Sequence, residues 1–246
     1  MRYQLTADYH THTYRSDGHG IVEGNIKEAI KNGLKTLAIT DHGPFHNRKG
    51  RCPFEYQLVN KYELKKYQKK YPEIKLLSGI EANLISLRGD LDITKEQQKA
   101  FDIIVMGQHR TPHGLKFWDN ISWRLRNFFP TNKWRREKVT RAYLKAMENN
   151  KITILAHLNR YIKANIKPIA EMAAKKNILI ELNGKRVDLT QKEIDDCVNA
   201  GVKFVISSDA HYSEHVGYPK AVWDFLDEYH VPRDRIVNIV GEPILN

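Results

Sequence analysis

The stretch Asp8-Tyr9-His10-Thr11-His12 decides the fold, because it ends the first apolar segment with two imidazoles spaced two residues apart. Residues at this spacing on a strand point to the same face, so we expect both imidazoles to face inward together. A lone inward histidine is usually a core residue with satisfied hydrogen bonds, whereas a pair preceded by Asp8 on the same face indicates a metal site. The stretch therefore predicts a strand with metal ligands at its end, supported by Asp8.

Apolar, strand-like segments alternate with helical patterns from this stretch to the other end of the chain. Such alternation is typical of parallel β/α units and does not fit sandwiches or helix bundles. We expect strands within residues 3–12, 36–41, 75–81, 102–107, 152–157, 178–183 and 203–208. We expect helices within residues 23–32, 55–70, 134–149, 166–176, 190–199 and 219–229, with a capping box from Thr190 to Glu193. The seven units predict an α/β fold in the form of a parallel barrel.

Length and composition fit one folded domain. The chain has 246 residues, a length at which α/β barrels commonly form a single domain. Its composition, with 41% hydrophobic and 28% charged residues, is ordinary for a globular protein.

The sequence has neither a signal-peptide pattern nor an apolar run of about 18 residues, so we expect a soluble, cytoplasmic protein without a membrane partner. Cys52 and Cys197 lack CxxC spacing, which favours a reducing compartment and argues against a thiolate metal site.

The net charge of +11 predicts a surface that attracts anions. Phosphorylated metabolites, nucleic acid and acidic membranes all fit this charge, as does a lysine-rich surface kept for solubility. A basic and aromatic insertion around residues 110–138 interrupts the β/α rhythm, and long connections of this kind are commonly lids or binding loops. The insertion is either a lid or helix packed on the barrel, or a platform on which bases stack while cations follow a phosphate backbone.

Residues that bind metals recur at the ends of the later strands. Neighbours on a strand face opposite ways, so we expect His42 to reach the centre while Asp41 supports it. Glu81 ends an otherwise apolar strand, which costs free energy unless a cation neutralises the carboxylate. Asp209 and His211 repeat the two-residue spacing of the first pair. The remaining candidates at strand ends are His109 and His157.

These candidates should meet in one place, because the C-terminal strand ends of a β/α barrel form a single mouth. One ion takes about four to six ligands, so we expect two to three divalent ions, about 3.5 to 4 Å apart. Imidazole and carboxylate ligands without thiolate suit Zn, Mn or Fe.

The same motifs resemble those of the PHP (polymerase and histidinol phosphatase) family. The matching motifs are the HxH of His10 and His12, the TDH that ends at His42, the turn at residues 79–83, and the SDAH of Asp209 and His211. The resemblance covers nearly the whole chain, and it is closest to the small stand-alone PHP phosphatases rather than to the PHP modules inside DNA polymerases, which carry further domains. It implies a distorted (β/α)7, TIM-like barrel in a single PHP domain over residues 1–246.

A trinuclear metal site is also implied by this resemblance. Its ligands would be His10, His12, His42, Glu81, His109, His157, Asp209 and His211. Family members place a ninth ligand, Asp or His, shortly after the HxH pair, and spacing favours Asp17 with His19 in reserve. The segment after His109 begins Arg110-Thr111-Pro112 and is longer and more basic than in many small members, which leaves the substrate class open.

The leading hypothesis is a metal-dependent phosphatase that hydrolyses phosphomonoesters of small metabolites by a metal-bound hydroxide. Its substrate would resemble histidinol phosphate, or be a sugar or nucleotide phosphate. Arg160, Lys185 and Arg186 follow strand ends and are expected to bind the phosphate, although each could equally be a solvated surface charge.

Two other classes of function remain open. A nuclease or an end-processing phosphoesterase acting on nucleic acid would use the same ions, and the net charge and the insertion favour it. A module whose metals only stabilise the fold is disfavoured by an inward, carboxylate-bridged cluster at a barrel mouth. We expect the other histidines in loops or on the surface, with His215 close enough to the SDAH motif to touch substrate: His46, His113, His215 and His230. The sequence does not specify the physiological substrate, the metals or the oligomeric state.

Overall fold

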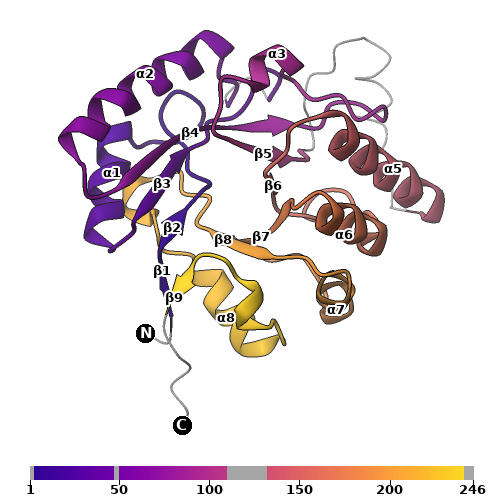
Figure 1. Cartoon of the computed structure of the whole chain (residues 1–246). Coiled ribbons are helices and arrows are strands. Elements are labelled where there is room, and N and C mark those ends of the chain that lie inside the picture. The colour runs from indigo at the N-terminus through magenta and orange to yellow at the C-terminus, as the bar shows by residue number, and fades with distance from the viewer. Residues whose placement is uncertain (1–2, 47–49, 110–131, 241–246) are drawn as a thin grey trace.

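A ring of parallel strands with helices around its outside forms the body of the molecule (Figure 1). The computed structural model describes residues 3–46, 50–109 and 132–240. In the seven-stranded sheet the order of the strands follows the chain, and each neighbouring pair is parallel. These strands are β2 (Ala7–Asp8), β3 (Thr36–Ile39), β4 (Lys75–Asn83), β5 (Ile103–Gly107), β6 (Ile154–Leu155), β7 (Leu179–Asn183) and β8 (Phe204–Ser207).

The two edges of this sheet approach each other just beyond β2 and β8. Thr11 forms a parallel bridge with Ala210, and the amide of His12 donates a hydrogen bond of 2.8 Å to the Ala210 carbonyl. The sheet is therefore a nearly closed barrel of seven parallel strands, and the predicted α/β barrel is confirmed.

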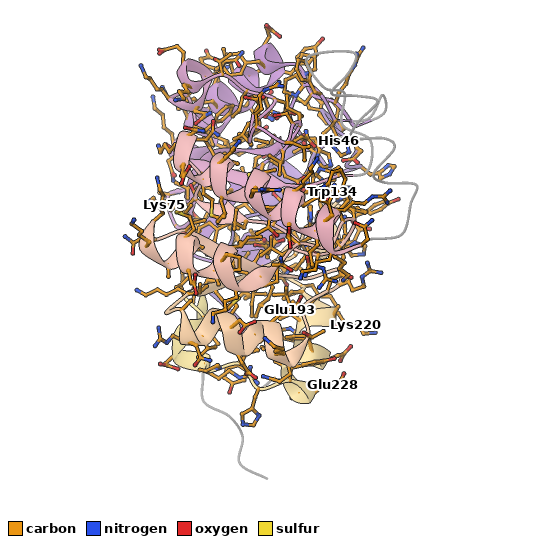
Figure 2. The ribbon with its side chains drawn as sticks, turned by 90° about the vertical axis from the view of Figure 1, so that its right-hand side faces the viewer. His46, Lys75, Trp134, Glu193, Lys220 and Glu228 are labelled. Atoms are coloured by element: carbon orange, nitrogen blue, oxygen red, sulfur yellow. The ribbon has the colours of Figure 1, made fainter. Side chains whose placement is uncertain are left out.

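Helices close to the predicted positions in the sequence surround the barrel. Figure 2 shows α5, α6 and α7 lying one above another along one side, in agreement with the packing of α5 on α6 and of α6 on α7. Thr190 caps α7, and its side chain accepts from the Glu193 amide as the predicted capping box requires. The longer helices are α1 (Val22–Lys31), α2 (Phe54–Lys70), α5 (Lys133–Asn149), α6 (Ile166–Lys175), α7 (Gln191–Asn199) and α8 (Lys220–Glu228).

Apolar side chains fill both faces of the strands, which is why the strands read as continuous apolar runs in the sequence. On β5, Ile104 and Met106 face the layer between the strands and the helices, whereas Ile103 and Val105 join a smaller cluster inside the barrel. Ala38 on β3 and Val205 on β8 belong to the same inner cluster. The inner cluster fills the barrel, so the polar residues at the strand ends are left at its mouth.

One predicted strand proved to be two. Residues 3–12 were expected as a single strand, but they form β1 (Gln4–Leu5) and β2, separated at Thr6. The reason is a change of partner: β1 pairs antiparallel with β9 (Ile239–Val240), and β2 pairs with β3. The short helix α3 (Lys95–Gln98), the 3-10 helices Ser213–His215 and Arg233–Arg235, and β9 were not predicted.

Most of the predicted basic and aromatic insertion lies outside the described residues. Only its last part, from residue 132, is described, and there α5 begins at Lys133 with Asn132 as its cap. In the three described ranges, no helix has both the length and the apolar character needed to cross a membrane.

Candidate metal centre

The strand ends bring all nine predicted ligands into one cluster. His10 and His12 follow β2, His42 follows β3, Glu81 lies in β4, and the turn after His12 carries Asp17. The other members of the cluster follow β5, β6 and β8 respectively: His109, His157, and the pair Asp209 and His211. Residues distant in sequence therefore meet at the barrel mouth.

Glu81 lies at the centre of this cluster and is 1% exposed. Its carboxylate faces imidazole nitrogens from four other strand ends, because β4 carries it between the neighbours on both sides. Gly107 on β5 leaves the space for it, since a Cβ there would collide with the Glu81 carboxylate. The distances from Glu81 are 2.6 Å to His42 Nδ1, 2.8 Å to His157 Nε2, 3.3 Å to His10 Nε2, 3.3 Å to His109 Nε2 and 3.6 Å to His12 Nε2.

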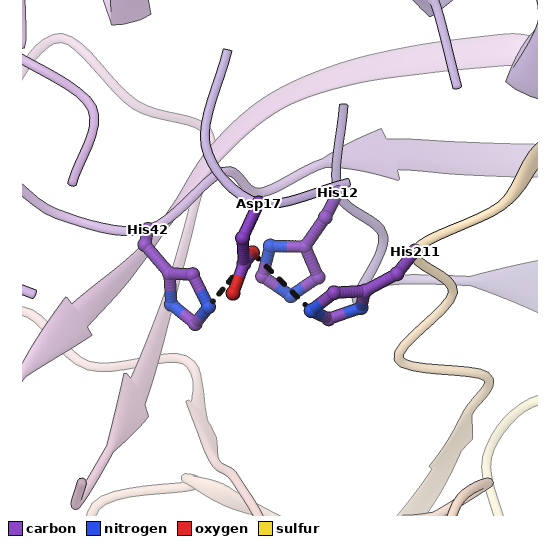
Figure 3. A group of neighbouring side chains, drawn as sticks. All are labelled: His12, Asp17, His42 and His211. Atoms are coloured by element: carbon purple, nitrogen blue, oxygen red, sulfur yellow. Dashed lines mark ion pairs between the residues drawn. The ribbon is translucent and has the colours of Figure 1, made fainter. Parts of the chain in front are cut away.

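A second group forms around Asp17 at the edge of the cluster. Figure 3 shows Asp17 between His42 and His211, with His12 beside them. Asp17 Oδ1 lies 3.3 Å from His42 Nε2 and 3.2 Å from His211 Nε2. His19, the reserve candidate, is exposed and stacks on Tyr212 with 4.4 Å between ring centroids, so the structure places Asp17 and not His19 in this group.

Two of the nine residues adopt backbone conformations that non-glycine residues rarely use. His157 has φ of 33° and Asp209 has φ of 53°, and each is the second residue after the end of its strand. Both side chains reach the cluster from this left-handed backbone: His157 Nε2 lies 2.8 Å from Glu81, and Asp209 Oδ1 lies 3.3 Å from His12 Nε2. Strain of this kind is commonly retained at functional sites, where the surrounding contacts hold it in place.

Three buried carboxylates support the cluster from behind. Glu181, on β7, accepts from His10 Nδ1 at 2.8 Å and from the His157 amide at 2.9 Å. Asp41 accepts from the amide of Thr13 at 2.7 Å and from Ser16 Oγ at 2.5 Å, which fixes the turn that carries Asp17. The Asp8 carboxylate accepts hydrogen bonds from three backbone amides, those of His10 (3.4 Å), Ser208 (3.1 Å) and Gly217 (2.9 Å), and so fixes the backbone around the cluster.

The charges of the cluster shift the pKa values of its members in opposite directions. Burial acts to raise the pKa of Glu81, but the charges of His42, His109 and His10 outweigh it and hold that pKa well below its usual range. Burial and the nearby His42 lower the pKa of His12 well below its usual range. Burial likewise acts to lower the pKa of His42, yet Glu81 and Asp17 raise it to about 10. In the metal-free cluster a carboxylate of lowered pKa therefore lies among imidazoles whose pKa values are shifted in opposite directions.

The residues present fit a centre of divalent metal ions. Buried ring nitrogens and carboxylate oxygens face one another at 2.6 to 3.6 Å, yet several of them lack hydrogen-bond geometry to any partner in the described ranges. These atoms are His10 Nε2, His12 Nε2, Asp17 Oδ1, His42 Nδ1 and Glu81 Oε2. Unpaired buried polar atoms are costly, and a cation satisfies converging lone pairs of this kind. Imidazole and carboxylate donors without thiolate suit Zn, Mn or Fe.

Cationic side chains line the cavity above the cluster, which has a volume of about 250 Å³. Arg160 lines it and lies 3.5 Å from Asp209 Oδ2, while its Nη2 donates to Asn183 Oδ1 at 3.0 Å. Lys185 also lines it, with Nζ 3.1 Å from Asp209 Oδ1. Arg186 does not line the cavity, since its side chain is 62% exposed and pairs with Asp188 at 2.8 Å. The structure thus places two of the three predicted phosphate-binding residues at the cavity.

Sequence reasoning missed two buried members of the site. His46 was expected in a loop or on the surface; it does lie in a loop, but it is buried, at 4% exposed, and stacks on His42 with 3.6 Å between ring centroids. Glu181 was also missed, although its position resembles that of Glu81 as a carboxylate in an apolar strand, and that signal could have found it. His215 and His230 are exposed as expected, and His113 lies outside the described residues.

Comparison with known proteins identifies the family. The PHP domain family matches residues 8–185 of this chain. The chain belongs to the PHP family. A probable phosphatase of Clostridium acetobutylicum is 31% identical, over 97% of this chain and 91% of the relative. A probable phosphatase of Proteus mirabilis is 27% identical, over 97% of this chain and 92% of the relative. The chain is therefore a metal-binding phosphatase of the PHP type.

Solved structures share the fold of this PHP protein at low sequence identity. The histidinol phosphate phosphatase of Lactococcus lactis, solved with zinc, L-histidinol and phosphate, superposes with a TM-score of 0.64 at 15% identity, covering 92% of this chain and 95% of that one. A protein of Listeria monocytogenes that is named as a histidinol phosphatase superposes with a TM-score of 0.62 at 16% identity. The match covers 88% of this chain and 99% of that one. These matches support the (β/α)7 barrel of the PHP fold.

Proposed function

We propose that this PHP protein hydrolyses phosphomonoesters of small metabolites at a centre of two to three divalent ions. The observation that carries this proposal is the convergence of imidazoles from several strand ends on the buried carboxylate of Glu81. The proposed ligands are His10, His12, Asp17, His42, Glu81, His109, His157, Asp209 and His211.

The chain's own residues provide binding and orientation. Bound divalent cations supply Lewis acidity and neutralise charge on the phosphoryl oxygens. Arg160 and Lys185 line the cavity beside the cluster and present cationic donors to a phosphate there. Arg160 is held in place by Asn183 and by the carbonyl of Arg186, at 3.0 and 2.7 Å, so its guanidinium needs little ordering when a ligand binds.

Small leaving groups fit the size of the cavity. A volume of about 250 Å³ lies just below the range of ligand sites, which commonly run from about 300 Å³ upward. The histidinol phosphate phosphatase of L. lactis shares the fold, and this supports substrates such as histidinol phosphate or a sugar or nucleotide phosphate. We expect turnover of an aryl phosphate by protein reloaded with Mn or Zn, and none after chelation, with elemental analysis of the same samples.

An end-processing phosphoesterase or nuclease acting on nucleic acid is the second candidate, favoured by the net charge of +11. Binding of oligonucleotides that weakens steeply between about 50 and 200 mM salt would support it. Small-ester turnover that is indifferent to salt, with no cleavage of oligonucleotides, would support the metabolite phosphatase instead.

Replacing Arg160 tests the proposed phosphate contact. We expect Arg160→Ala to raise KM for a phosphomonoester roughly three- to tenfold, because a charge-assisted contact with the phosphate is lost. Arg141→Ala, an exposed position on α5, serves as the matched control and should leave KM unchanged. Steady-state kinetics with metal-replete protein measure both, and an unchanged KM in Arg160→Ala would remove that residue from the role.

A further inference from the structure

His46 is a buried imidazole in the cavity wall that the proposed ligand set leaves unused. It is 4% exposed and lines the cavity together with His42 and His109. Its ring lies parallel to that of His42, with 3.6 Å between centroids and 5° between planes. The two histidines therefore form a stacked pair at one side of the cluster.

The stacking argues against a metal ion shared by these two rings. An imidazole binds a metal through a lone pair that lies in the plane of its ring, and the lone pairs of parallel, stacked rings do not converge on one point. His42, His46 and His109 each offer a ligand atom within 4.8 Å of the others, so proximity alone would have suggested a site. His42 already has its two nitrogens facing Glu81 and Asp17, at 2.6 and 3.3 Å.

Asn83 fixes which nitrogen of His46 carries the proton. The Asn83 amide group donates from Nδ2 to Asp92 at 2.5 Å, and this turns its oxygen toward the histidines. That oxygen lies 3.2 Å from His46 Nδ1 and 2.7 Å from His109 Nδ1. An amide oxygen only accepts hydrogen bonds, so both Nδ1 atoms are protonated and, in a neutral ring, Nε2 holds the lone pair.

Asp92 in turn holds Asn83 and the segment that carries His46. It accepts from the backbone amide of Asn83 at 2.8 Å and from that of Phe45 at 3.2 Å. The Phe45 contact fixes the backbone one residue before His46. One buried carboxylate thus sets both the amide that orients the ring and the chain from which the ring projects.

The two histidines then differ in where Nε2 lies. His109 Nε2 is 3.3 Å from Glu81 and belongs to the cluster. In the described ranges His46 Nε2 forms no hydrogen bond, and it is the ring nitrogen left for a ligand in the cavity. We propose that His46 is a specificity-determining residue that accepts a hydrogen bond from a hydroxyl of the leaving alcohol. A fully ionised phosphate has no proton to donate, so this contact selects the alcohol part of the substrate.

The inference rests on the proposed phosphatase function and narrows its substrates to phosphomonoesters of hydroxylated alcohols, such as sugar or nucleotide phosphates; histidinol phosphate, whose only hydroxyl is esterified, falls outside this class. Two pairs of esters of equal size test it: 2-hydroxyethyl phosphate against propyl phosphate, and 3-hydroxypropyl phosphate against butyl phosphate. In each pair a terminal hydroxyl is replaced by a methyl group. We expect wild-type, metal-replete protein to prefer the hydroxylated ester of at least one pair by roughly three- to tenfold in kcat/KM, as one neutral hydrogen bond gives.

His46→Phe keeps an aromatic ring for stacking on His42 but removes the acceptor. We expect this variant to bring the two esters of the preferred pair to within about twofold of each other. His46→Gln, which retains an acceptor oxygen, should keep part of the preference. His230→Phe, at an exposed position, is the matched control and should keep the wild-type ratio. Circular dichroism checks the folding of each variant, and elemental analysis measures its bound metal.

Three results would overturn the inference while the phosphatase proposal stands: no preference in wild-type protein, a preference retained by His46→Phe, or the loss of one metal ion from His46→Phe. The last result would make His46 a ligand. If wild-type protein reloaded with metal hydrolyses neither these esters nor p-nitrophenyl phosphate, the phosphatase proposal fails and the inference fails with it.

Discussion

Glu181 and Glu81 are both buried carboxylates in strands, but they contact His10 from opposite sides. Glu81 faces His10 Nε2 at 3.3 Å inside the cluster, whereas Glu181 accepts from His10 Nδ1 at 2.8 Å behind it. A carboxylate on the far nitrogen fixes the orientation of a metal-binding imidazole and increases its basicity. Glu181 is thus a positioning residue whose effect should appear in metal affinity.

We expect Glu181→Gln to weaken metal binding roughly ten- to hundredfold, the range found for such supporting partners. A glutamine can still accept from His10, but its amide nitrogen cannot replace the oxygen that accepts from the His157 amide and from Asn183. Titration of the stripped protein with Zn in a competing chelator measures the affinity. Glu171→Gln, exposed on α6, is the control, and equal affinities for the two variants would contradict the role of Glu181.

The pKa of His42 predicts how the metal-free protein responds to alkali. Burial acts to lower this pKa, but Glu81 and Asp17 raise it from 6.5 to about 10. A raised histidine pKa means that the folded state holds the proton more tightly, so the stabilisation is complete below pH 6.5 and is lost as the pH rises toward 10. We expect the free energy of unfolding of chelator-treated protein to fall between about pH 7 and about pH 9.

In urea unfolding experiments, His42→Gln should make the decrease of the free energy of unfolding with pH shallower. His230→Gln should keep the wild-type dependence on pH. Some slope should remain in His42→Gln, because the pKa of His10 is raised too: burial acts to lower it, but Glu181, Glu81 and Asp209 outweigh burial. Identical slopes in wild-type protein and His42→Gln would show that the His42 proton does not couple to folding.

Single residues of the site could be predicted only where the pattern of the sequence carries them. His10 and His12 share a strand-end spacing, and Glu81 interrupts an apolar run, so both features are visible in the sequence. His46 lies in a loop four residues after His42, and its burial comes from stacking and from the contact with Asn83. Neither contact leaves a periodic signal. The roles of the nine ligands and of Arg160 and Lys185 stay predictions.

At the scale of the elements, the capping box of α7 links a helix start to the site. Thr190 Oγ1 accepts from the Glu193 amide at 3.3 Å, and Glu193 Oε2 accepts from the Thr190 amide at 2.9 Å. The other oxygen of Glu193 accepts from Asn159 at 2.8 Å, directly before Arg160. The cap therefore also fixes the loop that presents this arginine to the cavity.

We expect Thr190→Ala to lower the free energy of unfolding by about 1 kcal/mol, because an amide at the helix start loses its acceptor. Urea unfolding followed by circular dichroism measures the change. Thr190→Ser retains the hydroxyl and should remain close to wild type. A Thr190→Ala protein as stable as Thr190→Ser would show that the cap contributes nothing measurable to stability.

Most elements were predictable because each repeats one simple pattern. Parallel strands covered on both faces read as apolar runs, and α1 buries Val22, Ile26 and Ala29 at helical spacing. The break at Thr6 was not predictable from local sequence, because it depends on β9, more than two hundred residues away along the chain and only two residues long. Short pairings of this kind are decided by tertiary contacts and not by propensity.

At the scale of the whole molecule, the proposed metal centre connects the ends of strands β2 to β6 and β8. Ions that bind the folded state and not the unfolded chain stabilise it by about 2.7 kcal/mol at a free concentration of one hundred times the dissociation constant. We therefore expect restoring Zn or Mn to chelator-treated protein to raise the melting temperature by roughly 5 to 10 °C.

Differential scanning calorimetry measures this shift. Potassium chloride at matched ionic strength is the control and should not reproduce it. Identical melting curves for stripped and reloaded protein would contradict a metal centre at the barrel mouth. The single domain over residues 1–246 stays a prediction.

The pairing of β1 with β9 makes the beginning and the end of the described chain neighbours, with Gln4 opposite Val240. A short linker could therefore join these two strands while new termini are opened in an exposed loop elsewhere. Chains whose ends adjoin commonly tolerate such circular permutation. A circularly permuted chain should thus fold to the same barrel. The architecture depends on which strands are neighbours and not on which strand comes first in the chain.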